Sequence, residues 1–182
     1  MGEVLKVGII GAGGIAQSRH IPALQKLEHK AQVVALYDIN HEHAKSVAET
    51  FSIPHVPEST EELFEIVDAV IICTPNKFHK ELTVAALDAG THVMCEKPMA
   101  MDAAECDTMI EASKRNNKLL TVAYHYRHTD AAIVAKKAIE NGDIGAPLVI
   151  RIQALRRRKV PGWGVFTNKE LQGGGSLIDY GC

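Results

Sequence analysis

Short apolar runs alternate with longer stretches of helical character over the first two-thirds of the chain. The apolar runs have the length of buried strands, and the stretches between them have the length and periodicity of helices. Repeated strand–helix units with short connections favour a parallel sheet that is covered on both faces. The pattern therefore predicts an α/β fold with a doubly wound parallel sheet. We expect strands at 4–10, 32–37, 69–73, 92–95 and 119–123, and helices at 14–27, 41–51, 60–66, 77–89 and 100–116.

The pattern changes after Ala123, where we expect a domain boundary between residues 1–123 and residues 124–182. One helix and one strand, which is all that the second segment offers, cannot form a core alone. The second segment is therefore interpreted as the incomplete start of another domain. Its expected elements are a helix at 130–141 that ends at Gly142, a strand at 148–155 and a loop at 162–175.

Composition and charge narrow the class of protein. The 182 residues are 46% hydrophobic and 23% charged, with a formal net charge of −2. This balance is typical of a globular protein and indicates neither nucleic acid nor a membrane as a partner. The one basic cluster, at 156–159, is more typical of a solvated strand edge than of an anion site. No apolar run approaches the length that spans a bilayer.

The cysteines, at positions 73, 95, 106 and 182, show neither a CxxC pair nor the spacing of metal ligands. Cys73 and Cys95 lie in apolar runs, where a thiol behaves as a small hydrophobic group. We therefore expect no metal site, no disulfide framework and a reducing compartment. Glu3 and Lys6 interrupt the N-terminus, which does not have the pattern of a signal peptide, so a soluble cytoplasmic protein is expected.

The first apolar run leads directly into a glycine turn at 11–16, GAGGIA, which has the spacing GxGxxA. Gly11 permits the tight turn, Gly13 leaves room for a pyrophosphate, and Ala16 lets the next helix pack closely on the strand. The N-terminus of that helix presents free N–H groups to the phosphates. This unit predicts a Rossmann-type domain that binds a dinucleotide. The residues expected to form the phosphate site are Gly11, Gly13, Gly14, Ile15 and Ala16.

An acidic residue, Asp38, ends the second expected strand about 20 residues beyond the glycine turn, as in dinucleotide sites. Its carboxylate can accept hydrogen bonds from the ribose hydroxyls and would repel the 2′-phosphate of NADP. The alternative is that Asp38 caps the helix that begins near His41. Because the strand, turn, helix and acid are in register, we predict NAD as the cofactor.

Three further segments carry polar residues in a distinctive order: Thr74-Pro75-Asn76 with His79, Glu96-Lys97-Pro98, and GGGSLIDYG at 173–181. Together they resemble the Gfo/Idh/MocA oxidoreductases, which include glucose–fructose oxidoreductase and inositol dehydrogenase. The resemblance covers the whole chain. It implies a Rossmann domain followed by an α+β open-sheet domain, hydride transfer between NAD and a sugar, cyclitol or related secondary alcohol, and a homo-oligomer at full length.

The segment at 74–79 follows an expected strand, at the edge where ligands bind in open α/β sheets. Thr74 and Asn76 offer polar groups near the cofactor, and Pro75 fixes the turn. In the resembling family a residue of this turn approaches the ribose, which makes His79 a candidate. A histidine on the helix surface is an equal alternative.

The segment at 96–98 also follows an expected strand. Lys97 has a compact charge that can hydrogen-bond a substrate oxygen, and the resemblance implies contact with the reacting hydroxyl or carbonyl. Glu96 is expected near the nicotinamide ribose, and Pro98 would stiffen the turn. A solvated lysine on a loop is the alternative.

Four candidates lie beyond the expected boundary. The resemblance places His125, Arg127 and Trp163 near the cofactor, whereas interface or core packing would explain them equally simply. It also places Asp179 beside a proton-transferring histidine four residues further on. The sequence stops at Cys182, so we expect a fragment of a longer protein, inactive by itself.

Two other functions remain open at this stage. One is an NAD-using glycosidase of the same family, which would oxidise its substrate only transiently. The other is a non-catalytic NAD-binding regulator. In every case the sequence predicts a small-molecule ligand, with a polyol or sugar as substrate if the protein is an enzyme.

Overall fold

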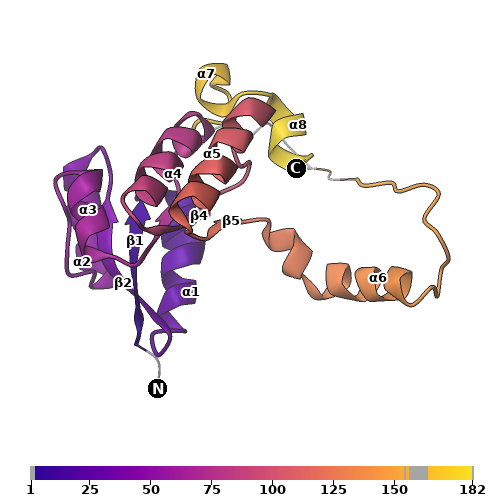
Figure 1. Cartoon of the computed structure of the whole chain (residues 1–182), viewed down its shortest axis with the longest axis horizontal. Coiled ribbons are helices and arrows are strands. Elements are labelled where there is room, and N and C mark those ends of the chain that lie inside the picture. The colour runs from indigo at the N-terminus through magenta and orange to yellow at the C-terminus, as the bar shows by residue number, and fades with distance from the viewer. Residues whose placement is uncertain (1–2, 154, 156–163, 182) are drawn as a thin grey trace.

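The sheet that the apolar runs predict is present in the structure, a computed structural model that describes residues 3–153, 155 and 164–181. Five strands pair in parallel in the order β2-β1-β3-β4-β5 (Figure 1). Every strand expected before residue 124 is confirmed, with bounds that agree within one residue. The strands are Leu5–Ile10 (β1), Ala31–Tyr37 (β2), Ala69–Ile72 (β3), His92–Cys95 (β4) and Leu120–Val122 (β5).

Helices cover both faces of this sheet, and each face has its own hydrophobic cluster. Val70 and Ile72 of β3 pack in one cluster with side chains of α3 (Thr60–Ile66), α4 (His79–Asp88) and α5 (Ala103–Asn116). Ile71, between them, packs in the other cluster with the helix after the glycine turn and with α2 (His41–Phe51). Successive strand residues face opposite sides, so the doubly wound prediction is confirmed. The helices are η1 (Ala16–His20), α1 (Ile21–Gln25), α2 (His41–Phe51), α3 (Thr60–Ile66), α4 (His79–Asp88) and α5 (Ala103–Asn116).

The first helix departs from the regular α-helix that the sequence predicts over 14–27. Residues Ala16–His20 form a π-helical segment, and α1 continues from it with Pro22 in its first turn. Such wide turns inside helices are frequently found at functional sites. The helix predicted from residue 100 begins at Ala103 instead, because Asp102 caps it by accepting a hydrogen bond from the Glu105 amide.

The strand order reverses between β1 and β3, and in a doubly wound sheet a ligand crevice opens at that point. The turn after β1 passes very close to the end of β3. A Cβ built on Gly11 would lie 2.8 Å from the carbonyl oxygen of Cys73, and Gly11 has a φ of +99°. Only glycine fits this position without strain.

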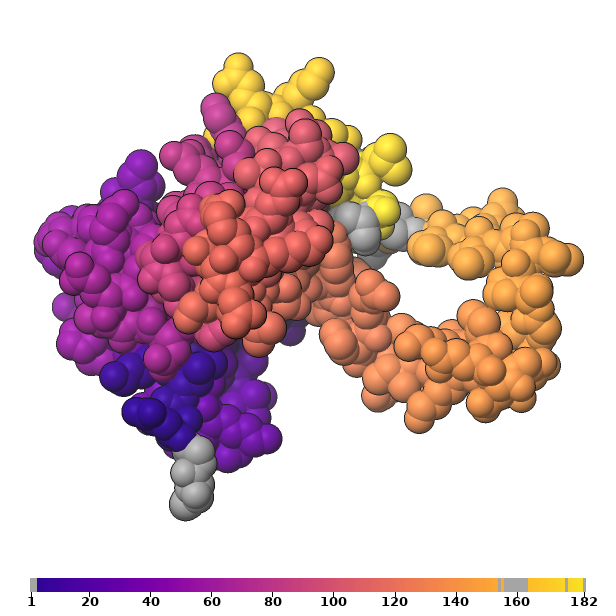
Figure 2. Space-filling view, in the orientation of Figure 1, coloured from indigo at the N-terminus to yellow at the C-terminus, as the bar shows by residue number. Residues whose placement is uncertain are grey.

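Beyond β5 the chain leaves the sheet through a short 3₁₀-helix, η3 (His125–His128), and α6 (Asp130–Glu140). Figures 1 and 2 show this arm projecting away from the sheet and its helices. The strand predicted at 148–155 is wrong for the residues described there, 148–153 and 155, which form no ladder. Their apolar side chains are exposed. A strand needs a neighbour to pair its backbone groups, and no described strand lies beside this segment.

After the arm, the chain returns to the carboxyl edge of the sheet with two short helices, α7 (Lys169–Gln172) and α8 (Gly175–Tyr180). The loop predicted at 162–175 is therefore wrong at α7. Asn168 caps this helix, because its Oδ1 accepts hydrogen bonds from the Glu170 and Leu171 amides.

Three features of the sequence lie outside the described residues: the basic cluster at 156–159, Trp163 and Cys182. Within the described part of the chain, no helix combines the length and apolar character needed to cross a membrane. Among the same residues, no group of three or more histidine, cysteine, aspartate or glutamate side chains could hold a metal ion.

The close approach at Gly11 makes a stability prediction. Gly11→Ala should lower the free energy of unfolding by about 2 kcal/mol or more, because it adds strain and a clash with backbone that cannot rotate away. Gly13→Ala is the matched control, since a Cβ there meets nothing within 4 Å, and it should change stability by less than about 0.5 kcal/mol. Urea denaturation measures both. Equal stability of the two variants would contradict the close approach.

Candidate active site

Two hollows lie at the carboxyl edge of the sheet, and the sequence candidates divide between them. A groove of about 480 Å³ follows the ends of β1, β2 and β3. A cavity of about 540 Å³ lies beyond the end of β4, where η3 and α8 meet the turn that carries Lys97. Gly11, Gly13, Asp38, Thr74 and Pro75 line the groove, whereas Lys97, His125, Arg127 and Asp179 line the cavity.

The glycine turn leaves open space at the groove. A Cβ built on Gly13 or Gly14 would meet nothing within 4 Å. The helix that starts here has amide N–H groups without intrahelical partners in its first turn, which includes Ile15. Ala16 is fully buried, so the start of the helix packs directly on the sheet. Space above the turn and donors at a helix N-terminus together fit a pyrophosphate.

Both carboxylate oxygens of Asp38 accept backbone amides, and one of these amides belongs to the glycine turn. Oδ2 accepts a hydrogen bond from the Ala12 amide at 2.8 Å, and Oδ1 accepts one from the Asn40 amide at 2.9 Å. The cap of α2 is Asn40, whose side chain accepts from the His43 amide, so the alternative that Asp38 caps this helix is wrong. Each carboxylate oxygen can accept a second hydrogen bond. Asp38 therefore retains the capacity to bind ribose hydroxyls in the groove that it lines.

Thr74 brings a buried hydroxyl to the same groove, and this hydroxyl has no hydrogen-bond partner in the part of the chain that the structure describes. An unsatisfied buried polar group costs about 1–3 kcal/mol. A polar group of a ligand in the groove would remove this cost. The orphaned hydroxyl, the open glycine turn and Asp38 together fit a bound dinucleotide.

Asn76 fastens the returning C-terminal segment to the turn after β3. It is buried in a short 3₁₀-helix, η2 (Asn76–Phe78), and its Nδ2 donates to the carbonyl oxygen of Gln172 at 2.9 Å. That contact joins residues 96 positions apart in the sequence. The side-chain amide of Asn76 therefore serves the docking of α7, and its contact with a cofactor stays a prediction.

His79 is fully buried at the start of α4, so the alternative of a surface histidine is wrong. Its Nδ1 lies 2.8 Å from the carbonyl oxygen of Pro98, and its Nε2 lies 2.9 Å from that of Thr74. The ring thus joins the turn after β3 to the turn after β4. Burial lowers the pKa of His79, although hydrogen bonds to the two carbonyls and the charge of Glu96 oppose this effect.

Glu96 is held at both oxygens at the end of β4. Oε1 lies 2.7 Å from Nε2 of His20, and Oε2 accepts a hydrogen bond from the Lys97 amide at 3.1 Å. Burial raises the pKa of this carboxyl, but the hydrogen bond and charge of His20 and the contacts with Lys97 outweigh it and hold the pKa below its usual value. Glu96 is therefore a buried, ionised group within the turn.

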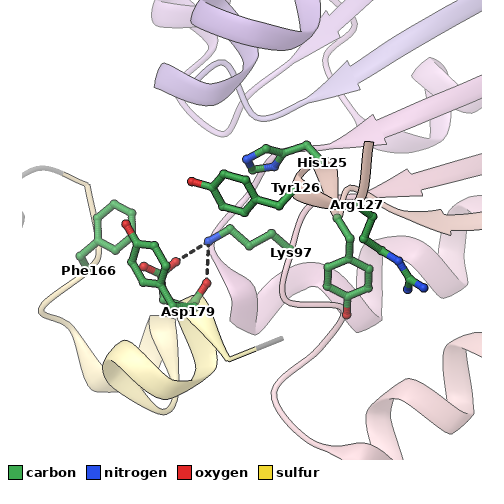
Figure 3. A pocket seen from close by; sticks show the side chains of 8 residues that line it. Lys97, His125, Tyr126, Arg127, Phe166 and Asp179 are labelled. Carbon is green, nitrogen blue, oxygen red and sulfur yellow. Dashed lines mark hydrogen bonds and ion pairs between the residues drawn. The ribbon is translucent and has the colours of Figure 1, made fainter. Parts of the chain in front are cut away.

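Lys97 and Asp179 form an ion pair that the sequence places 82 positions apart. The ammonium of Lys97 also donates to the carbonyl oxygen of Asp179 at 3.1 Å and lies 6.0 Å from the ring centre of Tyr180. Figure 3 shows the two charged groups meeting at the cavity, one from the turn after β4 and the other from α8. The structure thus brings together the two residues that the sequence predicts as catalytic.

The other walls of the cavity come from η3 and from the segment before α7. The rings of His125 and Tyr126 are in contact, tilted by 41°, with their centres 4.3 Å apart. In Figure 3, the guanidinium of Arg127 points away from Lys97, and Phe166 lies on the side of the cavity from which Asp179 comes. His125 and Arg127 are exposed and line the cavity. The contact of His125 and Arg127 with the cofactor stays a prediction.

Sequence reasoning missed several residues that shape this site. His20 and Gln172 make their contacts through partners 76 and 96 positions away, which no local pattern indicates. Tyr124, Tyr126 and Phe166 line the cavity as aromatic side chains. For Tyr124 and Tyr126, the sequence offers one indication, which is their place in the run Tyr124-His125-Tyr126-Arg127.

The burial of His79 makes a prediction about pH. The unfolded chain takes up a proton at this residue near pH 6.5, whereas the folded chain resists protonation. The stability that neutral His79 contributes is therefore present above pH 6.5 and is lost as the pH falls through the folded-state pKa. Urea midpoints at pH 7.5 and 5.5 should differ more for the wild type than for His79→Gln. Identical pH dependence in the two proteins would contradict the assignment.

Known proteins resemble the chain in sequence and in structure. D-glucoside 3-dehydrogenase of Escherichia coli (strain K12) is 40% identical, with 97% of this chain and 51% of the relative covered. Glucose-6-phosphate 3-dehydrogenase of Bacillus subtilis (strain 168) is 36% identical, with 97% and 50% covered. An oxidoreductase structure from Thermotoga maritima superposes with a TM-score of 0.85 at 31% identity, covering 97% of this chain and 56% of that one.

The chain spans about half the length of the curated relatives that it matches. The sequence model described as "Oxidoreductase family, NAD-binding Rossmann fold" matches residues 5–124, which include the whole sheet and the glycine turn. The resemblance inferred from the motifs is thereby confirmed. The chain belongs to this Gfo/Idh/MocA family of NAD-binding oxidoreductases.

Proposed function

We propose that the whole protein is an NAD-dependent oxidoreductase that acts on a secondary alcohol of a sugar or cyclitol. The observation that carries this proposal is the Lys97–Asp179 pair in a cavity at the same sheet edge as the groove that the glycine turn and Asp38 line. The two curated relatives described above are named as 3-dehydrogenases of a glucoside and of a glucose phosphate. A small polyol or sugar therefore suits the cavity as substrate.

The chain's own residues would divide the work between the two hollows. The glycine turn would hold the pyrophosphate, Asp38 the ribose hydroxyls, and Thr74 a polar group deeper in the groove. A bound nicotinamide would supply the hydride acceptor or donor. Each of these protein groups is already fixed by the fold, which lowers the ordering cost of binding.

At the cavity, Lys97 would act on the reacting oxygen of the substrate. Its ammonium can donate a hydrogen bond to that oxygen and stabilise the negative charge that develops when an alcohol loses its proton. Asp179 holds the ammonium in place through its side chain and its backbone carbonyl. The aromatic rings beside the pair offer flat apolar surfaces, which suit the C–H faces of a sugar ring.

We also propose the domain boundary at 123/124 and a homo-oligomeric, cytoplasmic protein. The last contact of the sheet is the hydrogen bond from the Ala123 amide to the carbonyl oxygen of Cys95. The exposed apolar residues of 148–153 and 155 need a cover in the whole protein, which further sheet or a second subunit would provide. Free thiols at Cys73, Cys95 and Cys106 suit a reducing compartment.

Cofactor preference should depend on Asp38. The wild type should bind NADH more tightly than NADPH, because a carboxylate repels the 2′-phosphate and hydrogen-bonds the ribose. Asp38→Ala should narrow the ratio of the two dissociation constants by about tenfold to a hundredfold. Asp68→Ala is a matched control, since Asp68 also accepts a backbone amide, that of Lys6, but at the opposite end of the sheet. Fluorescence titration measures the ratio, and equal affinity of the wild type for both cofactors would overturn the assignment.

Lys97 should affect turnover far more than cofactor affinity. In the whole protein, Lys97→Ala should lose about 10²–10⁴-fold in kcat, the usual contribution of a positioned acid–base group. NADH binding should change little, because Lys97 lines the cavity and not the groove. The control is Lys114→Ala, because Lys114 is an exposed lysine of α5. This variant should leave kcat and NADH binding unchanged. The measurement is NADH formation with a panel of sugars and cyclitols. Near-normal turnover of Lys97→Ala would reduce Lys97 to a structural residue.

A further inference from the structure

We propose that His20 is a positioning residue for Lys97, acting through Glu96. The inference rests on the proposed role of Lys97 at the substrate oxygen. No local sequence pattern indicates it, because His20 lies in the helix after the glycine turn and Glu96 lies 76 positions further on. The contact between them joins the segment that begins at the phosphate site to the turn that carries Lys97.

The contact is short and sheltered. Nε2 of His20 lies 2.7 Å from Oε1 of Glu96, and the two side chains are only 15% and 11% exposed. A sheltered carboxylate needs hydrogen-bond donors in place of water. His20 supplies the donor to Oε1 and the Lys97 amide supplies the donor to Oε2. Both oxygens are thus held by the protein, and Glu96 has one defined orientation.

The orientation of Glu96 determines that of the turn. Oε2 accepts the amide hydrogen of Lys97, and Nδ1 of His79 lies 2.8 Å from the carbonyl oxygen of Pro98, the next residue. The backbone of Lys97 therefore lies between two anchors. Its side chain extends from there to Asp179 at the cavity.

Removal of the imidazole would leave Oε1 without its donor in a site with little access to water. The carboxylate would regain hydrogen bonds by rotating toward solvent, which takes the acceptor away from the Lys97 amide. The ammonium would then sample more positions relative to the substrate oxygen. Small displacements of a positioned group reduce the rate steeply, while the groove that holds the cofactor keeps its own contacts.

The π-helical form of Ala16–His20 is consistent with this role. A π-helical turn is wider than an α-helical turn and changes the direction of the side chains that follow it. His20 is the last residue of that segment, and it donates outward from the helix to Glu96. The segment Ala16–His20 therefore starts beside the proposed phosphate site and ends at His20, which contacts the turn that carries Lys97.

The test compares four variants of the whole protein. His20→Gln keeps an N–H donor at about the position of Nε2. His20→Asn places the donor nearer the backbone, out of reach of Oε1 of Glu96, and His20→Ala removes the donor. His29→Ala is the control, because His29 is an exposed histidine close to the same helix. The readouts are hydrogen–deuterium exchange of the Lys97 amide, kcat, KM and the NADH dissociation constant.

We expect the Lys97 amide to exchange about tenfold to a hundredfold faster in His20→Ala and His20→Asn, the effect of losing a hydrogen bond to a charged group. kcat should fall by a similar factor, and the NADH dissociation constant should change less than about threefold. His20→Gln should restore most of both losses, and His29→Ala should match the wild type. If His20→Ala does not fold, the Gln and Asn pair decides.

Three results separate the inference from the proposed function. Unchanged exchange of the Lys97 amide in His20→Asn and His20→Ala would overturn the link through Glu96. Equal damage in His20→Gln and His20→Asn would overturn the donor role of the imidazole. If the amide exchange changes as expected but Lys97→Ala keeps full turnover, the link stands and the catalytic role of Lys97 fails.

Discussion

The backbone of the turn after β1 lies so close to the end of β3 that position 11 has no room for a Cβ. This approach fixes where the following helix begins, and so where its free amide groups lie relative to Thr74. Asp38 adds a second constraint, because its carboxylate holds the Ala12 amide from the end of β2. Three strand ends thus meet around one turn. The groove exists because these ends approach closely while Gly13 and Gly14 leave the space above them open.

Buried polar groups make the turn after β4 equally well defined. Glu96 is only slightly exposed to water and His79 is fully buried. Both carboxylate oxygens of Glu96 have protein partners, and both ring nitrogens of His79 lie within hydrogen-bond distance of backbone carbonyl oxygens. Such contacts contribute modestly to net stability, but losing one partner leaves a costly orphan. Conformations of the turn that break one of these contacts are therefore costly, although each contact by itself adds little to the net stability. In the proposed function, this asymmetry would keep Lys97 in one position at the substrate.

Much of the sheet domain could be predicted from the sequence, because its signals are local. The apolar runs predict the strands, and the glycine spacing predicts the tight turn after β1 that Asp38 contacts. The contacts of His20 and Gln172 could not be predicted, since each depends on a partner brought close only by the folded chain. The strand expected at 148–155 failed for a related reason. Its composition suits a strand, but pairing requires a neighbour that composition does not reveal.

The cavity depends on the docking of α7 and α8, which is a long-range event. Lys97 and Asp179 lie 82 positions apart and meet only in the folded chain. Holding such distant segments together has an entropic cost, which a single partly buried ion pair offsets only in part. Contacts of α7 help to offset this cost. Asn76 donates a hydrogen bond to the carbonyl oxygen of Gln172, and Gln172 is itself buried. The docked segment is thus held by a buried hydrogen bond near α7 and by the ion pair at α8. Because the first contact does not involve Lys97, the proposed exchange of part of the ammonium's bonding, from Asp179 to a substrate oxygen, would leave the wall of the cavity in place.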